Sequence, residues 1–319
     1  MKVYVLYENE EWMPPLRKAL AQRNLETEEI FLNGGVLDFG ETPKPGVYIN
    51  RMSPSSHTRG HQAGVRFAKE YLTYLESFTG CRLINGSQAF RLEVSKVHQY
   101  AALEAFGIRT PRTIAVTGTK DMGTASRVLK PPFITKHNQG GKGLGVQLFR
   151  SHEGLDEFLK EGSFQDSPDG INLLQQYIEP AEAFITRVEM VDGQFLYAIR
   201  SSTEDGFELC PADACEIGDA FCPAPDSKAT ADEKFRLRHE ITAEDPLVKR
   251  YLAFMKAHEI EVAGIEFVED SEGNRYTYDI NSTSNYNGKV EAKLSVAGMD
   301  AIAVMAEREL QCLIGHAAA

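Results

Sequence analysis

The stretch that decides the fold is Val262-Ala-Gly-Ile-Glu-Phe-Val-Glu269 with its continuation Asn274-Arg-Tyr-Thr-Tyr-Asp-Ile-Asn281. Both halves are rich in β-branched and aromatic residues, which are enriched in strands. Between them, Glu272-Gly273 is a turn signal, so the sequence predicts a β-hairpin.

The acidic residues of this hairpin fall on one face. A two-residue loop pairs Ser271 with Asn274 and thereby sets Glu266 directly opposite Asp279. Because side chains alternate along a strand, the same face also carries Asn281. The other face, which we expect in the core, carries Ile265, Phe267, Tyr278 and Ile280.

Two carboxylates in this position indicate a metal site, because like charges directly opposite each other destabilise a sheet. A cation held by oxygen ligands relieves that repulsion, and carboxylates with an amide oxygen suit Mg²⁺ or Mn²⁺ shared with a substrate phosphate. We therefore expect Glu266, Asp279 and Asn281 to be metal ligands. A solvent-exposed acidic face is the alternative, and a loop one residue longer would separate the acids onto opposite faces.

Composition limits the class of protein. The chain has 319 residues, of which 42% are hydrophobic and 25% charged, as in a soluble protein of two or three domains. A net charge of −12 argues against a broad nucleic-acid surface. Residues 1–7 read as a first strand rather than a signal peptide, and no segment reaches the length of a membrane span. Five cysteines, including the cluster Cys210, Cys215 and Cys222 with no common zinc spacing, suggest a reducing, cytoplasmic location.

Hydrophobic periodicity alternates between strands and helices, which favours an α/β fold with a mainly parallel sheet in its first part. Strands are predicted near 2–7, 27–31, 46–50, 82–85, 113–116, 132–136, 146–149, 172–178, 184–190 and 194–199. Helices are predicted near 12–23, 62–79, 95–106, 246–258 and 299–312. The polar, acidic stretch 203–245 is expected to be a loop excursion or a lid.

A glycine-rich loop follows the strand that ends at Lys136. It reads His137-Asn-Gln-Gly-Gly-Lys-Gly-Leu-Gly-Val146, and its glycines let backbone N–H groups approach a ligand closely. Lys136 and Lys142 add positive charge, which suits a triphosphate. The loop is no Walker motif, since Gly143 follows Lys142, and it runs into a strand rather than a helix. A phosphate-covering flap between two strands is therefore predicted, with a plain flexible hairpin as the alternative.

Taken in chain order, these motifs resemble the ATP-grasp superfamily, and most of all its RimK-like and glutathione-synthetase-like carboxylate–amine ligases. The resemblance covers most of the chain and keeps the order of the motifs. Besides the loop and the final hairpin it rests on Val47-Tyr-Ile-Asn-Arg-Met-Ser53, Ser95-Lys96, Ala105-Phe-Gly-Ile-Arg-Thr-Pro-Arg-Thr113, Leu174-Gln-Gln-Tyr-Ile-Glu-Pro180 and Phe184-Ile-Thr-Arg187.

The resemblance implies an N-terminal pre-ATP-grasp α/β domain over 1–93. A central subdomain with the flap over 94–176 and a C-terminal subdomain with the metal site over 177–319 would clasp the nucleotide. It assigns Arg187 and Arg200 to the reacting phosphate and Arg51 to the substrate. It assigns the nucleotide to Lys96, Lys136, Gly140, Gly141, Gly143, Gly145, Gln175, Gln176, Tyr177, Ile178 and, for the ribose, Glu182.

The sequence departs from the family pattern in three places. Ile185 stands where the family has a ribose-binding acid, so Glu182 is assigned that role, with Glu179 as the alternative. Residues 206–213 stand where RimK-type ligases carry Arg and Asn near the phosphates. Residues 282–287 lack the usual Ser-Pro-Gly, so the resemblance leaves the acceptor unidentified.

The activity implied by the resemblance is amide formation through an acyl phosphate, with ATP and Mg²⁺ or Mn²⁺ as cofactors. The substrates would be an amino acid or a peptide, with a protein tail as an alternative, and the resemblance implies a homodimer. No nucleic-acid or membrane partner is expected. A nucleotide-dependent binding or regulatory module is the alternative of another class, and a carboxylate kinase that forms no amide is a third.

Overall fold

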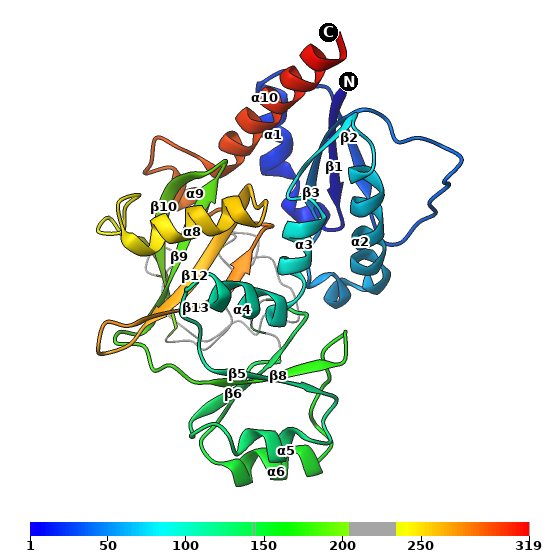
Figure 1. Cartoon of the computed structure of the whole chain (residues 1–319). Coiled ribbons are helices and arrows are strands. Elements are labelled where there is room, and N and C mark those ends of the chain that lie inside the picture. The colour runs from blue at the N-terminus through cyan, green and yellow to red at the C-terminus, as the bar shows by residue number, and fades with distance from the viewer. Residues whose placement is uncertain (142, 144, 204–233, 319) are drawn as a thin grey trace.

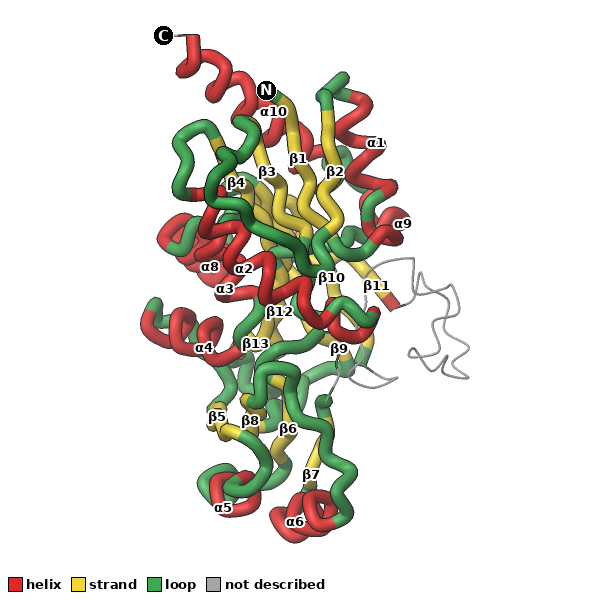
Figure 2. Tube along the Cα trace, turned by 90° about the vertical axis from the view of Figure 1, so that its right-hand side faces the viewer, coloured by secondary structure: helices red, strands yellow, loops and turns green. Residues whose placement is uncertain are grey.

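The structure is a computed structural model that describes residues 1–141, 143, 145–203 and 234–318. It contains three β-sheets, which follow one another along the long axis of the molecule (Figure 1, Figure 2). Within the described ranges, none of the helices is both long enough and apolar enough to cross a bilayer.

The N-terminal sheet is parallel, with the strand order β2-β1-β3-β4. Its elements are β1 (Lys2–Tyr7), α1 (Pro14–Gln22), β2 (Thr27–Phe31), β3 (Gly46–Arg51), α2 (Gln62–Glu76) and β4 (Cys81–Ile84). Side chains of β1 alternate between two cores: Val3 and Val5 pack with α1 and the C-terminal helix α10 (Gly298–Ala318), while Tyr4 and Leu6 pack with α2. Burial on both faces is typical of a parallel sheet.

A second, antiparallel sheet has the order β5-β8-β6-β7 and lies at the far end of the molecule (Figure 1). It consists of β5 (Thr113–Thr117), β6 (Phe133–His137), β7 (Gln147–Phe149) and β8 (Ile171–Gln176). The helices α5 (Met122–Ser126) and α6 (His152–Lys160) cover one face, where Met122 and Leu155 pack on Phe133 and Leu174. Because residues alternate along β6, Ile134 and Lys136 point to the uncovered face.

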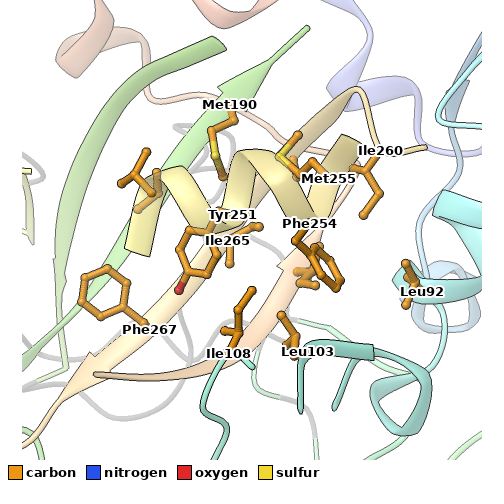
Figure 3. Close-up of a cluster of buried hydrophobic side chains, with 14 of the residues drawn as sticks. Leu92, Leu103, Ile108, Met190, Tyr251, Phe254, Met255, Ile260, Ile265 and Phe267 are labelled. Carbon is orange, nitrogen blue, oxygen red and sulfur yellow. The ribbon is translucent and has the colours of Figure 1, made fainter. Parts of the chain in front are cut away.

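The third sheet is antiparallel, with the order β11-β10-β9-β12-β13. It consists of β9 (Phe184–Val191), β10 (Gln194–Ser202), β11 (Phe235–Leu237), β12 (Val262–Glu269) and β13 (Arg275–Asn281). One face packs against α8 (Pro246–Ala257) and α4 (Lys96–Ala105), where Tyr251 and Phe254 of α8 meet Ile265 of β12 and Leu103 of α4 (Figure 3). The short helices η1 (Glu10–Trp12), η2 (Ser56–Arg59), α3 (Ser87–Glu93) and α9 (Gly288–Glu291) complete the described elements.

The edge strand β13 is paired by side chains instead of a further strand. Gln99 of α4 accepts a hydrogen bond from the Ile280 N–H at 3.1 Å and donates one to the Ile280 carbonyl at 2.9 Å. Tyr100 donates to the Tyr278 carbonyl at 2.9 Å. Because buried backbone groups need partners, α4 fixes the strand that carries two of the predicted metal ligands.

Most predicted elements are confirmed, with differences at their ends. The C-terminal helix is longer than the predicted range of 299–312. Part of the predicted loop at 203–245 is wrong, because β11 lies within it and pairs with β10. The cysteines Cys210, Cys215 and Cys222, the family departure at 206–213 and Lys142 of the predicted flap lie outside the described residues.

The predicted two-residue turn of the last hairpin is also wrong. The ladder of β12 and β13 ends with Glu269 opposite Arg275, so residues 270–274 form the loop. Asp270 organises this loop, since its Oδ1 accepts the backbone N–H groups of Glu272 at 3.0 Å and Asn274 at 2.8 Å. An aspartate that accepts hydrogen bonds from backbone N–H groups two or more residues later is a turn signal, and here it acts together with Gly273.

Candidate active site

A cavity of about 270 Å³ lies where the three sheets approach one another. Strands β6 and β8 line it from one side, strands β9, β12 and β13 from the other, and the segment after β3 closes one end. Of the described residues that line it, two are basic, Lys136 and Arg187, and three are acidic, Glu93, Glu266 and Asp279. The charges of these five side chains define the chemistry of the site.

The glycine loop forms one wall of this cavity. Gly141 and Gly143 line it, and a side chain at Gly141 would come within 3.5 Å of Ser55 of the N-terminal domain. Gly145 has a φ of +74°, and a side chain there would lie 2.5 Å from the ring of His137. The close approach and the left-handed backbone both require glycine at position 145.

Lys136 is a half-buried cation without a carboxylate partner within the described ranges. Its Nζ donates to the Tyr278 carbonyl at 3.2 Å and to the Tyr100 hydroxyl at 3.3 Å, both neutral groups. Burial lowers the pKa of Lys136, while the charges of Asp279 and Glu266 act in the opposite direction. A buried charge that only neutral groups solvate is costly, so the position suits a residue that meets an anionic ligand.

Arg187, in contrast, is held between two acids. Its Nε donates to Glu189 at 2.5 Å, and its Nη1 donates to Glu266 at 2.8 Å. A side chain at Gly264 would overlap the guanidinium group, so this glycine provides the space in which Arg187 lies. Arg187 thus forms structural ion pairs with two acids and also lines the cavity.

The predicted pair of acids lies as expected, with Glu266 opposite Asp279 in the β12–β13 ladder. Burial raises the pKa of Glu266, and the like charge of Asp279 adds to this effect. Burial would also raise the pKa of Asp279, but Lys96 and Lys136 outweigh it and hold that pKa below its ordinary value. Lys96 donates directly to Asp279 Oδ1.

A β-bulge directly after Glu266 corrects the predicted faces of β13. Thr277, not Tyr278, points into the core, where it is fully buried and lies 2.6 Å from the hydroxyl of Tyr251. Tyr278 instead lines the cavity and donates from its hydroxyl to Glu266 Oε2 at 2.9 Å. A bulge adds one residue to a strand and re-aims its side chains, which strict alternation does not foresee.

The residues present fit a hard divalent cation. In the described part of the chain no three His, Cys, Asp or Glu side chains form a metal cluster by themselves. A cation here would therefore need the amide oxygen of Asn281 and phosphate oxygens besides Glu266 and Asp279, which is the donor set that Mg²⁺ prefers. Asn281 lines the cavity, and its buried Nδ2 has no hydrogen-bond partner among the described residues.

Comparison with known proteins gives distant relatives. No protein-family model matches the sequence. N-acetylaspartylglutamate synthase A from Mus musculus is 24% identical over 206 residues, which cover 60% of this chain and 51% of that protein. Beta-citrylglutamate synthase B from Homo sapiens is 28% identical over 138 residues, which cover 42% of this chain and 34% of that protein. The chain thus spans about half the length of the first relative and a third of the second.

Solved structures resemble the whole chain. An ATP-grasp RimK domain protein from Sphaerobacter thermophilus superimposes with a TM-score of 0.65 and 14% identity over 95% of this chain and 98% of that chain. The ATP-grasp ligase PsnB, solved with a minimal precursor, Mg and ADP, gives a TM-score of 0.63 and 14% identity over 97% of both chains. The chain has the ATP-grasp fold. The fold expected from its motifs is confirmed.

In this ATP-grasp chain, the predicted adenine segment lines one end of the cavity, as Gln175, Gln176, Tyr177 and Ile178 do. Apolar side chains face one another across this end, with Ile134 on β6 and Ile185 and Val268 on β9 and β12. An apolar slot between two sheets suits a planar base, while a few polar groups fix its orientation.

Several predicted residues of the ATP-grasp site lie outside the cavity lining. Lys96 is buried against Asp279, neither solvated nor among the lining residues. Gly140 and Gly145 belong to the loop without lining the cavity, and Glu182 is exposed. Arg200 stacks over the Phe184 ring, with its guanidinium carbon 5.3 Å from the ring centre. Their assigned roles in binding and catalysis stay predictions.

Arg51 lies behind the wall at the opposite end of the cavity. It is 3% exposed and donates to the Ser284 carbonyl and to Asn285 Oδ1, both at 2.7 Å. Burial lowers the pKa of Arg51 to about 10, and its Nε has no hydrogen-bond partner among the described residues. The side chain thus supports a lining residue, Asn285, rather than lining the cavity itself. Its predicted role toward substrate stays a prediction.

Sequence reasoning missed four residues of this site: Glu93, Glu189, Tyr278 and Trp12. Glu189 had a usable signal, because residues two apart on a strand share a face and Arg187 stands two positions earlier. Trp12 lies far from the motifs in sequence and had no such signal. Glu93 lies two residues before the Ser95-Lys96 motif, but nothing in the local pattern places its side chain in the cavity.

Proposed function

We propose that this chain is an ATP-dependent ligase that joins a carboxylate to an amine through an acyl phosphate. One observation carries the proposal. A single cavity brings together a half-buried lysine without an acidic partner, a glycine loop and the oxygen donors of Glu266, Asp279 and Asn281. A cation for phosphate opposite oxygen ligands for a metal is what a nucleotide triphosphate with its metal requires.

Different lining residues would bind the base and the phosphates. The apolar slot at Ile134, Ile185 and Val268 would hold the base, and Lys136 would contact the phosphates. Glu266, Asp279 and Asn281 would hold Mg²⁺ or Mn²⁺, which supplies charge neutralisation between phosphate oxygens. The PsnB structure, which contains Mg and ADP, supports this use of the fold.

In the first step a substrate carboxylate oxygen attacks the γ-phosphorus, and ADP leaves. Lys136 and Arg187 would stabilise the negative charge on the transferred group, because fixed cations in a site without bulk water act strongly. In the second step an uncharged amine attacks the acyl carbon, phosphate leaves, and the nitrogen passes one proton to the departing phosphate. The glycine loop over the cavity would keep water away from the acyl phosphate.

The substrates belong to the end of the cavity near the N-terminal domain. Ser53, Ser55, Thr283 and Asn285 line this end. The names of two relatives, N-acetylaspartylglutamate synthase A and beta-citrylglutamate synthase B, denote products that contain glutamate. These names support an amino acid as one substrate. A peptide is the alternative, supported by the PsnB structure with its precursor. The homodimer and the cytoplasmic location implied earlier stay predictions.

The test measures ADP and phosphate released from ATP and Mg²⁺ in the presence of amino-acid mixtures, with mass spectrometry of the products. We expect nucleotide turnover that depends on both an acid and an amine, together with a product whose mass is that of the two minus water. Turnover that neither substrate stimulates would contradict the ligase and favour a nucleotide-dependent binding module. Phosphorylated acid without amide would favour a carboxylate kinase.

A further inference from the structure

Glu93 is an acid of the cavity that the proposed steps do not use. It is the last residue of α3, 4% exposed, and it lines the cavity. A carboxylate at the C-terminal end of a helix lies at the negative end of the helix dipole, so this position does not stabilise the helix. Burial of a charge is a further cost, so the residue calls for a partner that offsets both.

No cation of the described ranges supplies that partner. Of the three acids that line the cavity, Glu266 pairs with Arg187 and Asp279 pairs with Lys96. Glu93 forms no such pair, and its hydrogen bonds come from the backbone and side chain of Ser282, both neutral groups. Two buried cations act on Glu93 only through space, because Lys96 donates to Asp279 and Arg51 donates to Ser284 and Asn285.

The position of Glu93 also fixes where a ligand would meet it. Ser282, which Glu93 binds, lies between Asn281 and Thr283, and both of these line the cavity. Asn281 belongs to the predicted metal and phosphate side, while Thr283 belongs to the end near the N-terminal domain. A group bound by Glu93 would therefore lie where the acyl phosphate and the second substrate meet.

We infer that Glu93 forms the subsite for the ammonium group of the amine substrate. The inference rests on the proposed ligase. Among the described residues that line the cavity, Lys136 is the one basic side chain without an acidic partner, and Glu93 is the one acidic side chain without a cationic partner. A substrate carboxylate would be repelled by Glu93, whereas an ammonium group would complete an ion pair. The acceptor is thus a primary amine that is charged when it binds, such as a free amino acid, and not an alcohol or an N-acylated compound. Because only the uncharged amine can attack the acyl carbon, Glu93 takes up the proton that the bound ammonium group loses.

Glu93→Gln tests this subsite, because the amide oxygen still accepts the Ser282 N–H and only the charge is lost. Hydroxylamine is largely uncharged at neutral pH and intercepts acyl phosphates as hydroxamates, so it reports the first step without needing the ammonium subsite. With ATP, Mg²⁺ and an amino-acid mixture, we expect the variant to form hydroxamate as the wild type does. We expect its amide formation to fall by about tenfold or more, as for loss of a hydrogen bond to a charged group. Exposed Glu70→Gln is the matched control and should behave as the wild type in both assays.

A second measurement needs no turnover. Trp12 is the single tryptophan of the chain and lines the same cavity, so its fluorescence reports binding. The probes are an amino-acid mixture without Trp and Tyr and the same mixture N-acetylated. We expect the wild type, loaded with ADP and Mg²⁺, to bind the first about tenfold or more tightly than the second, and Glu93→Gln to lose this difference.

The outcomes separate the subsite from the ligase. If hydroxamate and amide fall together in Glu93→Gln, or if its Mg²⁺ requirement rises, Glu93 serves the strand or the metal and the inference is overturned. Unchanged amide formation, or equal binding of both mixtures by the wild type, overturns it as well. If the wild type itself forms neither hydroxamate nor amide, the proposed ligase fails, and the subsite with it.

Discussion

Glu266 and Asp279 lie directly opposite each other across the β12–β13 ladder, and each carries a different cation at its side. Arg187 binds Glu266 and Lys96 binds Asp279, so the repulsion between the acids is balanced without any metal. The ion pairs explain how the apo site folds. They also mean that a loss of turnover must be separated from a loss of stability when either acid is changed.

Asp279→Asn separates the two effects when it is combined with Lys96→Met. We expect the single variant to lose turnover by about a hundredfold or more, as for loss of a charge-stabilising group. It also leaves Lys96 buried without its carboxylate, which typically costs about 3–5 kcal/mol of unfolding free energy. The double variant should regain stability in urea unfolding but not turnover. Recovery of turnover in the double variant would show that Asp279 serves only to pair Lys96.

Tyr278→Phe tests the bulge and the role of the hydroxyl that it brings to Glu266. Loss of a residue that hydrogen-bonds a metal ligand typically lowers metal affinity by about 10–100-fold. We therefore expect the Mg²⁺ concentration for half-maximal turnover to rise by about tenfold or more. Tyr251→Phe is the matched control, because its hydroxyl bonds Thr277 on the core face. That variant should lose about 1 kcal/mol of stability without a change in Mg²⁺ dependence. Equal Mg²⁺ profiles for both variants would contradict the assigned face of Tyr278.

The bulge marks the limit of what the sequence predicts about this site. Strand patterns were sufficient for the hairpin and for Lys136 beside the glycine loop. The opposition of Glu266 and Asp279 was predicted from a two-residue turn that is wrong, and it holds because the bulge shifts the register by one residue. The register after Glu266 depends on the longer loop at 270–274, and alternation alone therefore assigned Tyr278 to the core.

Residues distant in sequence account for the other part that could not be predicted. The α4 side chains that pair the edge of β13, such as Gln99, leave no local pattern, because their partners are fixed only by tertiary packing. The same holds for Arg51, whose partners Ser284 and Asn285 lie more than 200 residues further along the chain. Their side-chain types fit a solvated helix face or a surface loop equally well, so burial decides their roles.

Lys136→Met tests the cation assigned to the phosphates. We expect turnover to fall by about a hundredfold or more, since a fixed charge beside the transferred group is lost. Stability should be equal or higher, because a half-buried charge that meets only Tyr100 and a backbone carbonyl is replaced by an apolar side chain. Thermal unfolding and ADP release measure the two effects. The exposed Lys130→Ala is the control, and turnover of Lys136→Met near that of this control would contradict the assignment.

Gln99→Leu tests whether α4 holds the metal strand. The change leaves the Ile280 N–H and carbonyl without their partner, and each unsatisfied buried group costs about 1–3 kcal/mol. We expect a lower free energy of unfolding in urea and faster amide hydrogen exchange along β13 than along β9. Gln22→Leu is the control, since that side chain is exposed at the end of α1 and does not line the cavity. Unchanged exchange of β13 would show that Gln99 does not hold the strand.

The pH dependence of stability gives an independent test of the unpaired charge on Glu93. Burial raises the pKa of Glu93 above its ordinary value of 4.5, and Asp279 adds to this effect against the donors of Ser282. A raised pKa in the folded state means that the stabilising contribution is complete below the unfolded value and is lost as the pH rises through the folded one. The glutamine of Glu93→Gln does not titrate. The unfolding free energy of this variant should therefore rise relative to that of the wild type as the pH rises from 4.5 toward neutrality. Urea unfolding of both proteins over this range measures the difference, with Glu70→Gln as the control for removal of an exposed charge. A difference that shrinks toward neutral pH would mean that a cation pairs Glu93 in the folded protein and leaves nothing for an ammonium group to complete.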